Sequence, residues 1–112
     1  MAGMISVSIL SNRLPSIAAQ LPGAVRAVIG KTVSDVESGA KSRAAVDTGA
    51  MRNSIQGHIT GDASGEVSVG AEYGIYQEYG THKMPAHPFM HPAADAARPG
   101  FEAAVAALVS KI

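Results

Sequence analysis

The chain has 112 residues and a mass of 11.4 kDa, a size that fits a single domain, residues 1–112, around one hydrophobic core. Hydrophobic residues make up 46% of it but aromatic residues only 4%, so alanine, valine and isoleucine must build that core, and a lone copy should be modestly stable. Nine basic residues balance nine acidic ones without a cluster of cations, which argues against a nucleic-acid-binding face, and the absence of cysteine excludes disulfides and thiolate metal sites.

The N-terminal stretch contains the first predicted strand. In "MISVSIL", Ile5, Val7 and Ile9 alternate with serines, which is the period-2 pattern of a half-buried strand. The same stretch lacks the basic region and the unbroken apolar core of a signal peptide. No apolar run approaches the roughly 20 residues that span a bilayer. We therefore expect a cytosolic chain without a membrane segment.

Residues 14–46 are predicted to form two helices. Apolar side chains recur there at steps of three and four residues, which places them on one face. They are Leu14, Ile17, Ala18, Leu21, Val25, Val28, Ile29, Val33, Val36 and Ala40. A proline inside a helix costs about 3 kcal/mol, so we expect a short helix, a kink or restart at Pro22, and a main helix to about Val46. Gly30 and Gly39 weaken this helix, and the sequence leaves open whether they admit another backbone or are simply tolerated.

A turn and a β-hairpin are predicted next. The stretch "DTG" after the helix consists of turn-forming residues. Residues 52–60 and 66–72 have the pattern of strands, and "GDASG" has the composition of the loop between them. Gly61 and Gly65 are expected to supply positive φ angles in that loop.

The C-terminal part is predicted to be helical. "YGIYQEYG" should form one or two turns, and the prolines of "MPAHPFMHP" should hold that segment extended. From Pro92 onward we expect a helix with a kink at Pro99. Its apolar stripe is Phe101, Val105, Leu108 and Ile112. The predicted fold class is α+β, in which a long N-terminal helix and a C-terminal helix pack on a small antiparallel β-sheet built around the hairpin.

Residues 73–93, "YGIYQEYGTHKMPAHPFMHPA", concentrate bulky and angular side chains. They hold all three tyrosines, one of the two phenylalanines, three of the four histidines and three of the six prolines. Prolines lie between or beside His82, His87 and His91, so their ring nitrogens are not expected to converge on a metal. We expect no metal and no other cofactor.

Catalysis is weakly supported in the same segment. Glu78 among tyrosines could be a general acid, but no second carboxylate or nucleophile motif accompanies it. An interface role fits better, because aromatic and methionine side chains are enriched at interface cores and prolines lower the entropy lost on docking. The alternative is that Tyr76, Met84 and Phe89 pack only on the chain's own core.

Two blocks, "VDTGAMRNSI" and residues 73–93, resemble the neck and tail-completion family of long-tailed bacteriophages, which includes minor tail protein Z-like proteins. The family pattern is a helix ending in Asp-Thr-Gly-Ala-Leu, then Arg and Ser, a hairpin, Tyr-Ala-x-Tyr-x-Glu-x-Gly-Thr, and Ala-x-Pro-Phe-x-x-Pro-Ala. The matching positions are Asp47, Thr48, Gly49, Ala50, Arg52, Ser54, Tyr73, Tyr76, Glu78, Gly80, Thr81, Ala86, Pro88, Phe89, Pro92 and Ala93. Met51 replaces the usual Leu and Gly74 the usual Ala.

The resemblance implies a structural virion protein rather than an enzyme. Such a protein joins the head connector to the tail as a ring around the DNA channel, and the six-fold symmetry of tails favours a hexamer. Its implied neighbours are head-completion and tail-terminator or tail-tube proteins. DNA would pass through without sequence-specific binding, with Lys31, Lys41 or Arg43 as possible channel-lining residues. The chain would be made in the host cytoplasm and reside in the neck or tail of the virion.

We further expect residues 73–93 to pack beside the hairpin and, together with Arg52, to form an interface with a neighbouring subunit or with the next ring. Its expected members are Arg52, Tyr73, Tyr76, Glu78, Tyr79, Gly80, Thr81, Met84, Pro88 and Phe89. Gly80 would permit a tight turn, and Glu78 could pair with Arg52 or with a cation of a neighbouring subunit. Two other functions remain open, which are a small hydrolase using Glu78 and His82 and a regulatory binding module encoded by a prophage.

Overall fold

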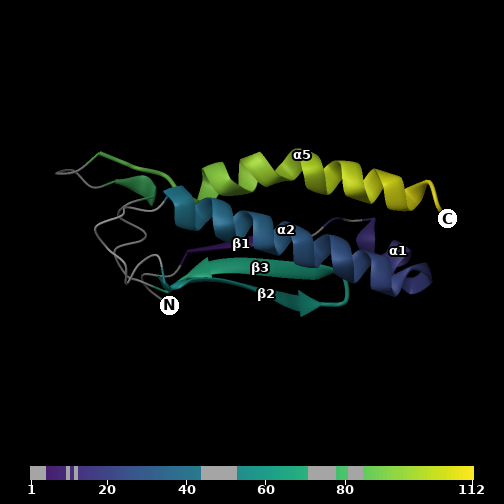
Figure 1. Cartoon of the computed structure of the whole chain (residues 1–112). Helices are drawn as coiled ribbons and strands as arrows, with labels where there is room; N and C mark the ends of the chain where they lie inside the picture. Colours follow the sequence, from purple (N-terminus) through teal and green to yellow (C-terminus); the bar gives the residue numbers. More distant parts are fainter. Residues whose placement is uncertain (1–4, 10, 12, 44–52, 71–77, 81–84) are drawn as a thin grey trace.

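The computed structural model describes residues 5–9, 11, 13–43, 53–70, 78–80 and 85–112. The elements follow in the order β1 (Ile5–Ile9), α1 (Leu14–Gln20), α2 (Pro22–Arg43), β2 (Ile55–Gly61), β3 (Ser64–Val69) and α5 (Met90–Val109). Figure 1 shows α2 and α5 running side by side above a three-stranded sheet. The predicted α+β class, with two helices packed on a sheet built around a hairpin, is therefore confirmed.

The two N-terminal helices are separated at a single residue, Leu21. Pro22 is the first residue of α2, a position where its missing N–H would have had no intrahelical partner. The predicted restart at Pro22 is confirmed, whereas the predicted end at Val46 lies outside the described residues. Within the described part of the chain, no helix is long and apolar enough to cross a bilayer.

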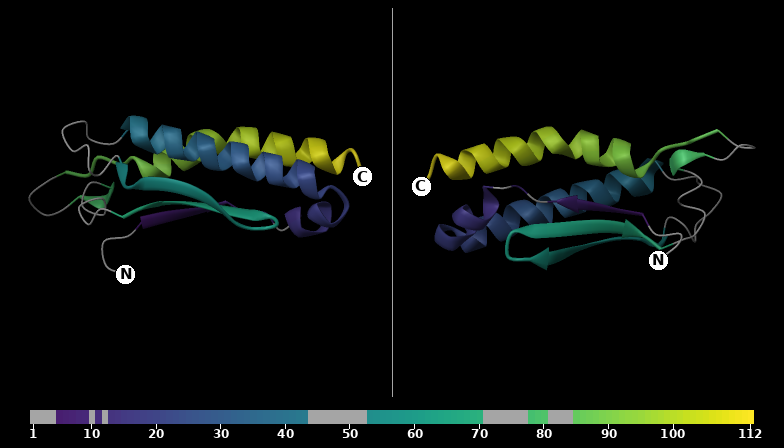
Figure 2. Two further views of the ribbon diagram at one scale, coloured as in Figure 1. Left: turned by 60° about the horizontal axis from the view of Figure 1, so that its bottom comes forward. Right: turned by 180° about the vertical axis from the view of Figure 1, so that it is seen from behind.

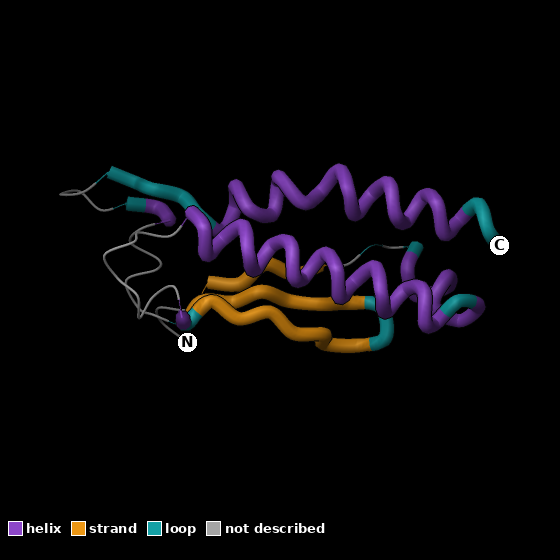
Figure 3. Tube along the Cα trace, in the orientation of Figure 1, coloured by secondary structure: helices purple, strands orange, loops and turns teal. Residues whose placement is uncertain are grey.

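The central strand of the sheet is β3, which pairs antiparallel with both β1 and β2. Gly65 lies opposite Ile9 on one side and Ile59 on the other. Because successive residues point to opposite faces, this row and every second row from it turn towards the helices, which lie over one face of the sheet in Figure 3. The buried members of these rows are Ile9, Ile55, Gly65, Val67 and Val69. The rows between them are polar and carry Ser8, Gln56, His58, Glu66 and Ser68.

Gly65 serves a different purpose from the one that the sequence indicated. Among the described glycines only Gly80 has a positive φ, so the expected positive φ angles at Gly61 and Gly65 are wrong. Both residues belong to strands instead, with Gly61 ending β2. A Cβ atom on Gly65 would lie 2.5 Å from Val33 Cγ2, so this glycine lets α2 approach the sheet closely.

The core lies between the helical pair and the inner face of the sheet. It consists mainly of aliphatic side chains, as the composition predicted, with Phe89 and Met90 at one end. The helices α2 and α5 touch where a Cβ atom on Gly39 would lie 3.2 Å from Ala93 Cβ. Around Gly30, by contrast, the space is open. The question that the sequence left open therefore has two answers, close helix packing at Gly39 and tolerance at Gly30.

Helix α5 departs from its predicted course at both ends. It begins at Met90, so the extended segment ends before Pro92, which occupies the first turn of the helix. Pro99 lies inside α5, which Figure 2 shows as one continuous, curved helix. Of the predicted stripe, Val105 and Leu108 are buried, whereas Ile112 is 54% exposed and lies beyond the end of the helix.

Candidate functional site

The start of α5 is held by a carboxylate from another part of the chain. Oε1 of Glu78 accepts hydrogen bonds from the backbone N–H groups of Phe89 at 2.9 Å and Met90 at 2.8 Å. Its Oε2 accepts a third from the N–H of His91 at 3.0 Å. Glu78 is only 2% exposed, so these charge-assisted bonds form away from solvent.

This arrangement satisfies every N–H group at the beginning of the helix. The first N–H groups of an α-helix have no partner within the helix. Phe89, the N-cap residue, has no side chain that could supply one, and the first turn contains no acidic residue. Glu78 takes three of these donors and Pro92 has none, which explains why a proline is accommodated here. The negative charge also lies at the positive end of the helix dipole.

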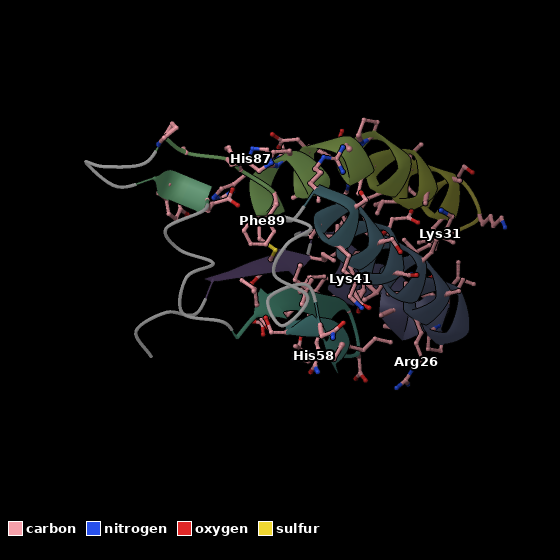
Figure 4. The ribbon with its side chains drawn as sticks, turned by 60° about the vertical axis from the view of Figure 1, so that its left-hand side comes forward. Arg26, Lys31, Lys41, His58, His87 and Phe89 are labelled. Atoms are coloured by element: carbon pink, nitrogen blue, oxygen red, sulfur yellow. The ribbon has the colours of Figure 1, made fainter. Side chains whose placement is uncertain are left out.

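Phe89 and Met90 fill the space beneath the carboxylate. Both are fully buried, and Phe89 is the largest fully buried side chain among the residues that the structure describes. Figure 4 shows Phe89 pointing inward from the start of α5, while His87 lies on the outside. The residues that donate to Glu78 thus also anchor the helix in the core.

An exposed aromatic pair lies beside the buried carboxylate. The Tyr79 hydroxyl and Nε2 of His91 are 2.9 Å apart, and the two ring centroids are 5.8 Å apart. His91 Nε2 is also 3.9 Å from Glu78 Oε2. Tyr79 is 61% exposed, so this pair presents its rings to the surface while its backbone is tied to the Glu78 cap.

The expected interface residues divide into three groups. Tyr79 and Pro88 are exposed, and Gly80 has a φ of 77°, a left-handed conformation that favours glycine. Glu78 and Phe89 are buried, and the Glu78 carboxylate accepts hydrogen bonds from a helix end of its own chain, whereas the predicted partner Arg52 lies outside the described residues. The remaining expected members, Arg52, Tyr73, Tyr76, Thr81 and Met84, lie outside the described residues.

The capping role of Glu78 escaped the sequence analysis. Capping signals are local, with Ser, Thr, Asp or Asn immediately before the helix, and this carboxylate lies 11 to 13 residues before the groups it binds. The helix start itself carries Phe89, a poor cap. A useful signal was nevertheless present, because a lone glutamate among aromatic residues precedes a helix start that lacks a cap of its own.

In the part of the site that the structure describes, exposed tyrosine, histidine and proline side chains surround a carboxylate that is already hydrogen-bonded. Both oxygens of Glu78 are engaged by backbone N–H groups, which leaves this carboxylate poorly placed to act as a general acid. Among the described residues, no three His, Asp or Glu side chains gather as metal ligands. His82 lies outside the described part.

Comparison with known proteins identifies one family. Residues 10–80 match the family model of the HK97-gp10-like proteins, described as a proposed tail component of bacteriophage HK97. The match covers more than half of the chain and ends at Gly80, two residues after Glu78. No curated protein and no solved structure shows a significant match.

Proposed function

Because the chain belongs to the HK97-gp10-like family of bacteriophage tail components, we propose that it is a structural protein of the virion neck or tail that helps to join the head to the tail. In this role, copies of the chain form a ring around the DNA channel, and the six-fold symmetry of tails favours a hexamer. Head-completion proteins would lie on one side of the ring and tail-terminator or tail-tube proteins on the other.

An exposed surface at the start of α5 is the observation that carries this proposal. We call it the docking surface and define it by its exposed residues, Tyr79, Pro85, His87, Pro88 and His91. The Glu78 cap fixes both ends of the surface to the same helix end. Aromatic and histidine side chains on a proline-stiffened segment lose little entropy when a partner covers them.

The charges on α2 fit a channel through which DNA passes without being held. Lys31 forms an ion pair with Asp35 at 2.8 Å, and Lys41 forms one with Glu37 at 3.1 Å. Figure 4 shows both lysines along this helix. A neighbouring carboxylate offsets the charge of each of these two lysines, which weakens their attraction for phosphates.

Assembly also explains the site better than hydrolysis. The hydrolase hypothesis needs a Glu78 carboxylate that can exchange protons with a substrate. This carboxylate is buried and accepts three backbone N–H groups. A regulatory module encoded by a prophage would use the docking surface in a different setting, and the presence of the chain in particles separates the two functions.

The proposal is tested by complementing a phage that lacks this gene with variants of the docking surface. We expect Tyr79→Ala to lower the titre of infectious particles at least tenfold and to leave separate heads and tails in electron micrographs. The side chain is exposed, so the free energy of unfolding should change by only about 0.5 kcal/mol. Tyr79→Phe keeps the ring and should retain most of the titre.

Ile112→Ala is the matched control, because Ile112 is an exposed apolar residue at the opposite end of the molecule, as Figure 1 shows. It should complement like the unchanged chain. If the chain is absent from purified particles, the structural role is wrong and the regulatory role is favoured.

A further inference from the structure

Both outer edges of the sheet carry backbone groups that point away from it. The N–H of Gly70 donates to the carbonyl oxygen of Ser54, next to the pair of Ile55 and Val69. Hydrogen-bonded pairs alternate along an antiparallel ladder, so the backbone groups of Gly57 and Ile59 point outward from β2. The same alternation on the other side of β3 turns the backbone groups of Ser6 and Ser8 outward from β1.

One half of the β2 edge is covered and the other half is open. Glu37 of α2 accepts a hydrogen bond at 2.6 Å from the outward N–H of Gly57. No described residue covers the outward backbone groups of Ile59 in this way. The Ile59 side chain lies in the row that faces the helices, yet it is 38% exposed. An open strand edge with an exposed apolar side chain invites pairing with another strand.

The edge of β1 has a pocket beside it. This pocket of about 450 Å³ lies between β1, α2 and α5. Its lining includes Ser8, Ile9, Thr32, Val36, Ala97 and Phe101. Ser8 and Ile9 point to opposite faces of the strand, so a pocket lined by both follows the outer edge of β1. The charged side chains of Arg13, Arg98 and Glu102 also line the pocket, and the half-buried Phe101 supplies apolar surface for an added side chain.

The two edges are complementary in strand direction and in face. In the sheet order β1-β3-β2, both outer strands are antiparallel to β3 and therefore parallel to each other. We consider β2 of one copy paired in parallel with β1 of the next. In a parallel pair, a residue whose backbone groups point towards the partner strand lies opposite a residue whose backbone groups point away from that partner. The backbone groups of Ile59 point away from β3, and those of Ile9 point towards β3. Ile59 of one copy can therefore lie opposite Ile9 of the next. Both belong to the row that faces the helices, so the helices of both copies stay on the same side of the shared sheet.

We propose that the open half of the β2 edge in one copy pairs in parallel with the β1 edge of the next copy, with Ile59 entering the neighbour's pocket. This interface rests on the ring of the proposed function and specifies how its subunits meet. The contact is heterologous, because each copy uses a different edge towards each neighbour, and such contacts close into a ring when the rotation allows it. A second copy is the occupant because this chain offers both halves of the contact.

Cysteine crosslinking tests the pairing directly, since the chain contains no cysteine of its own. With Ile59 opposite Ile9, Ser8 lies opposite His58 of the neighbour on the exposed polar face. Parallel neighbours at such a position lie within the Cα separation of about 4.4–6.8 Å that a disulfide spans. A chain with Ser8→Cys and His58→Cys, supplied to a phage that lacks the gene, should give a ladder of crosslinked species after oxidation of purified particles. Each single variant should give none, and a mixture of the two should stop at dimers.

A second experiment introduces the same negative charge at two equally exposed apolar positions. Ile59→Asp should lower incorporation into particles at least tenfold, whereas Val109→Asp should change it less than twofold. Val109 is equally exposed, at 38%, but lies on α5 away from the strand edges.

The outcomes separate this inference from the proposed function. Particles that contain the double cysteine variant without a ladder, or that incorporate Ile59→Asp normally, would overturn the edge pairing and leave the structural role intact. A crosslink between Ser8→Cys and a different virion protein would overturn it as well, because another chain then occupies the β1 edge. Absence of the unchanged chain from particles would instead refute the proposed function.

Discussion

Three backbone N–H groups at the start of α5 depend on one side chain, the carboxylate of Glu78. The ring of Phe89 is buried directly at this helix start. A variant that removes either side chain would therefore destabilise the fold, so its effect on assembly would not report on docking alone. Exposed residues such as Tyr79 are the proper probes of docking, whereas Glu78 and Phe89 are probes of stability.

We predict that Glu78→Ala lowers the free energy of unfolding by about 1–3 kcal/mol, because it leaves buried donors without a partner. Glu78→Gln keeps an acceptor oxygen but loses the charge, so it should cost less. Chemical denaturation followed by circular dichroism measures both changes. Asp95→Ala, at an exposed carboxylate on the same helix, is the control and should stay within about 0.5 kcal/mol. Equal stabilities of Glu78→Ala and Asp95→Ala would show that the cap contributes nothing.

At the scale of elements, α2 contains two glycines with opposite surroundings. Gly30 has open space where a Cβ atom would lie, whereas a Cβ atom on Gly39 would lie 3.2 Å from Ala93 Cβ of α5. Both positions carry the same intrinsic cost, since glycine in a helix interior is less stable than alanine by about 1 kcal/mol. Only at Gly39 does packing between helices oppose the replacement.

Gly30→Ala should therefore raise the free energy of unfolding by about 0.5–1 kcal/mol. Gly39→Ala should fail to give this gain, because α5 must shift to make room for the methyl group. Thermal unfolding of the two variants beside the unchanged chain measures the difference. If both variants gain stability equally, the close approach of α2 and α5 at Gly39 does not constrain the packing.

The elements that follow from local patterns could be predicted, and those that depend on distant contacts could not. The period-2 pattern predicted the sheet strands, and the cost of a proline inside a helix predicted the restart at Pro22. The purpose of Gly65 required knowing that Val33 lies above it. The Glu78 cap required knowing that segments more than ten residues apart meet. For the same reason the sequence predicted turn glycines at positions where the structure has strands.

At the scale of the whole molecule, the chain is long and thin. Its extents are 52 × 23 × 21 Å and its radius of gyration is 15.3 Å, larger than the about 13 Å of a compact domain of 100 residues. A thin shape with a core mainly of aliphatic side chains buries less surface than a globular one of equal length. Covering the open strand edges with neighbouring copies would recover part of this deficit.

Only the folded chain presents these strand edges. Association through them must therefore raise the free energy of unfolding as the protein concentration increases. We predict that the melting temperature rises by about 10–20 °C over a hundredfold increase in protein concentration, because that increase adds up to about 2.7 kcal/mol of stability and each kcal/mol moves the melting temperature by about 4–8 °C. Ile59→Asp should keep the melting temperature of the dilute unchanged chain but lose the dependence on concentration. Scanning calorimetry over a dilution series measures both. A concentration-independent melting temperature of the unchanged chain would contradict self-association of the free protein, because mass action allows no exception when only the folded edges pair.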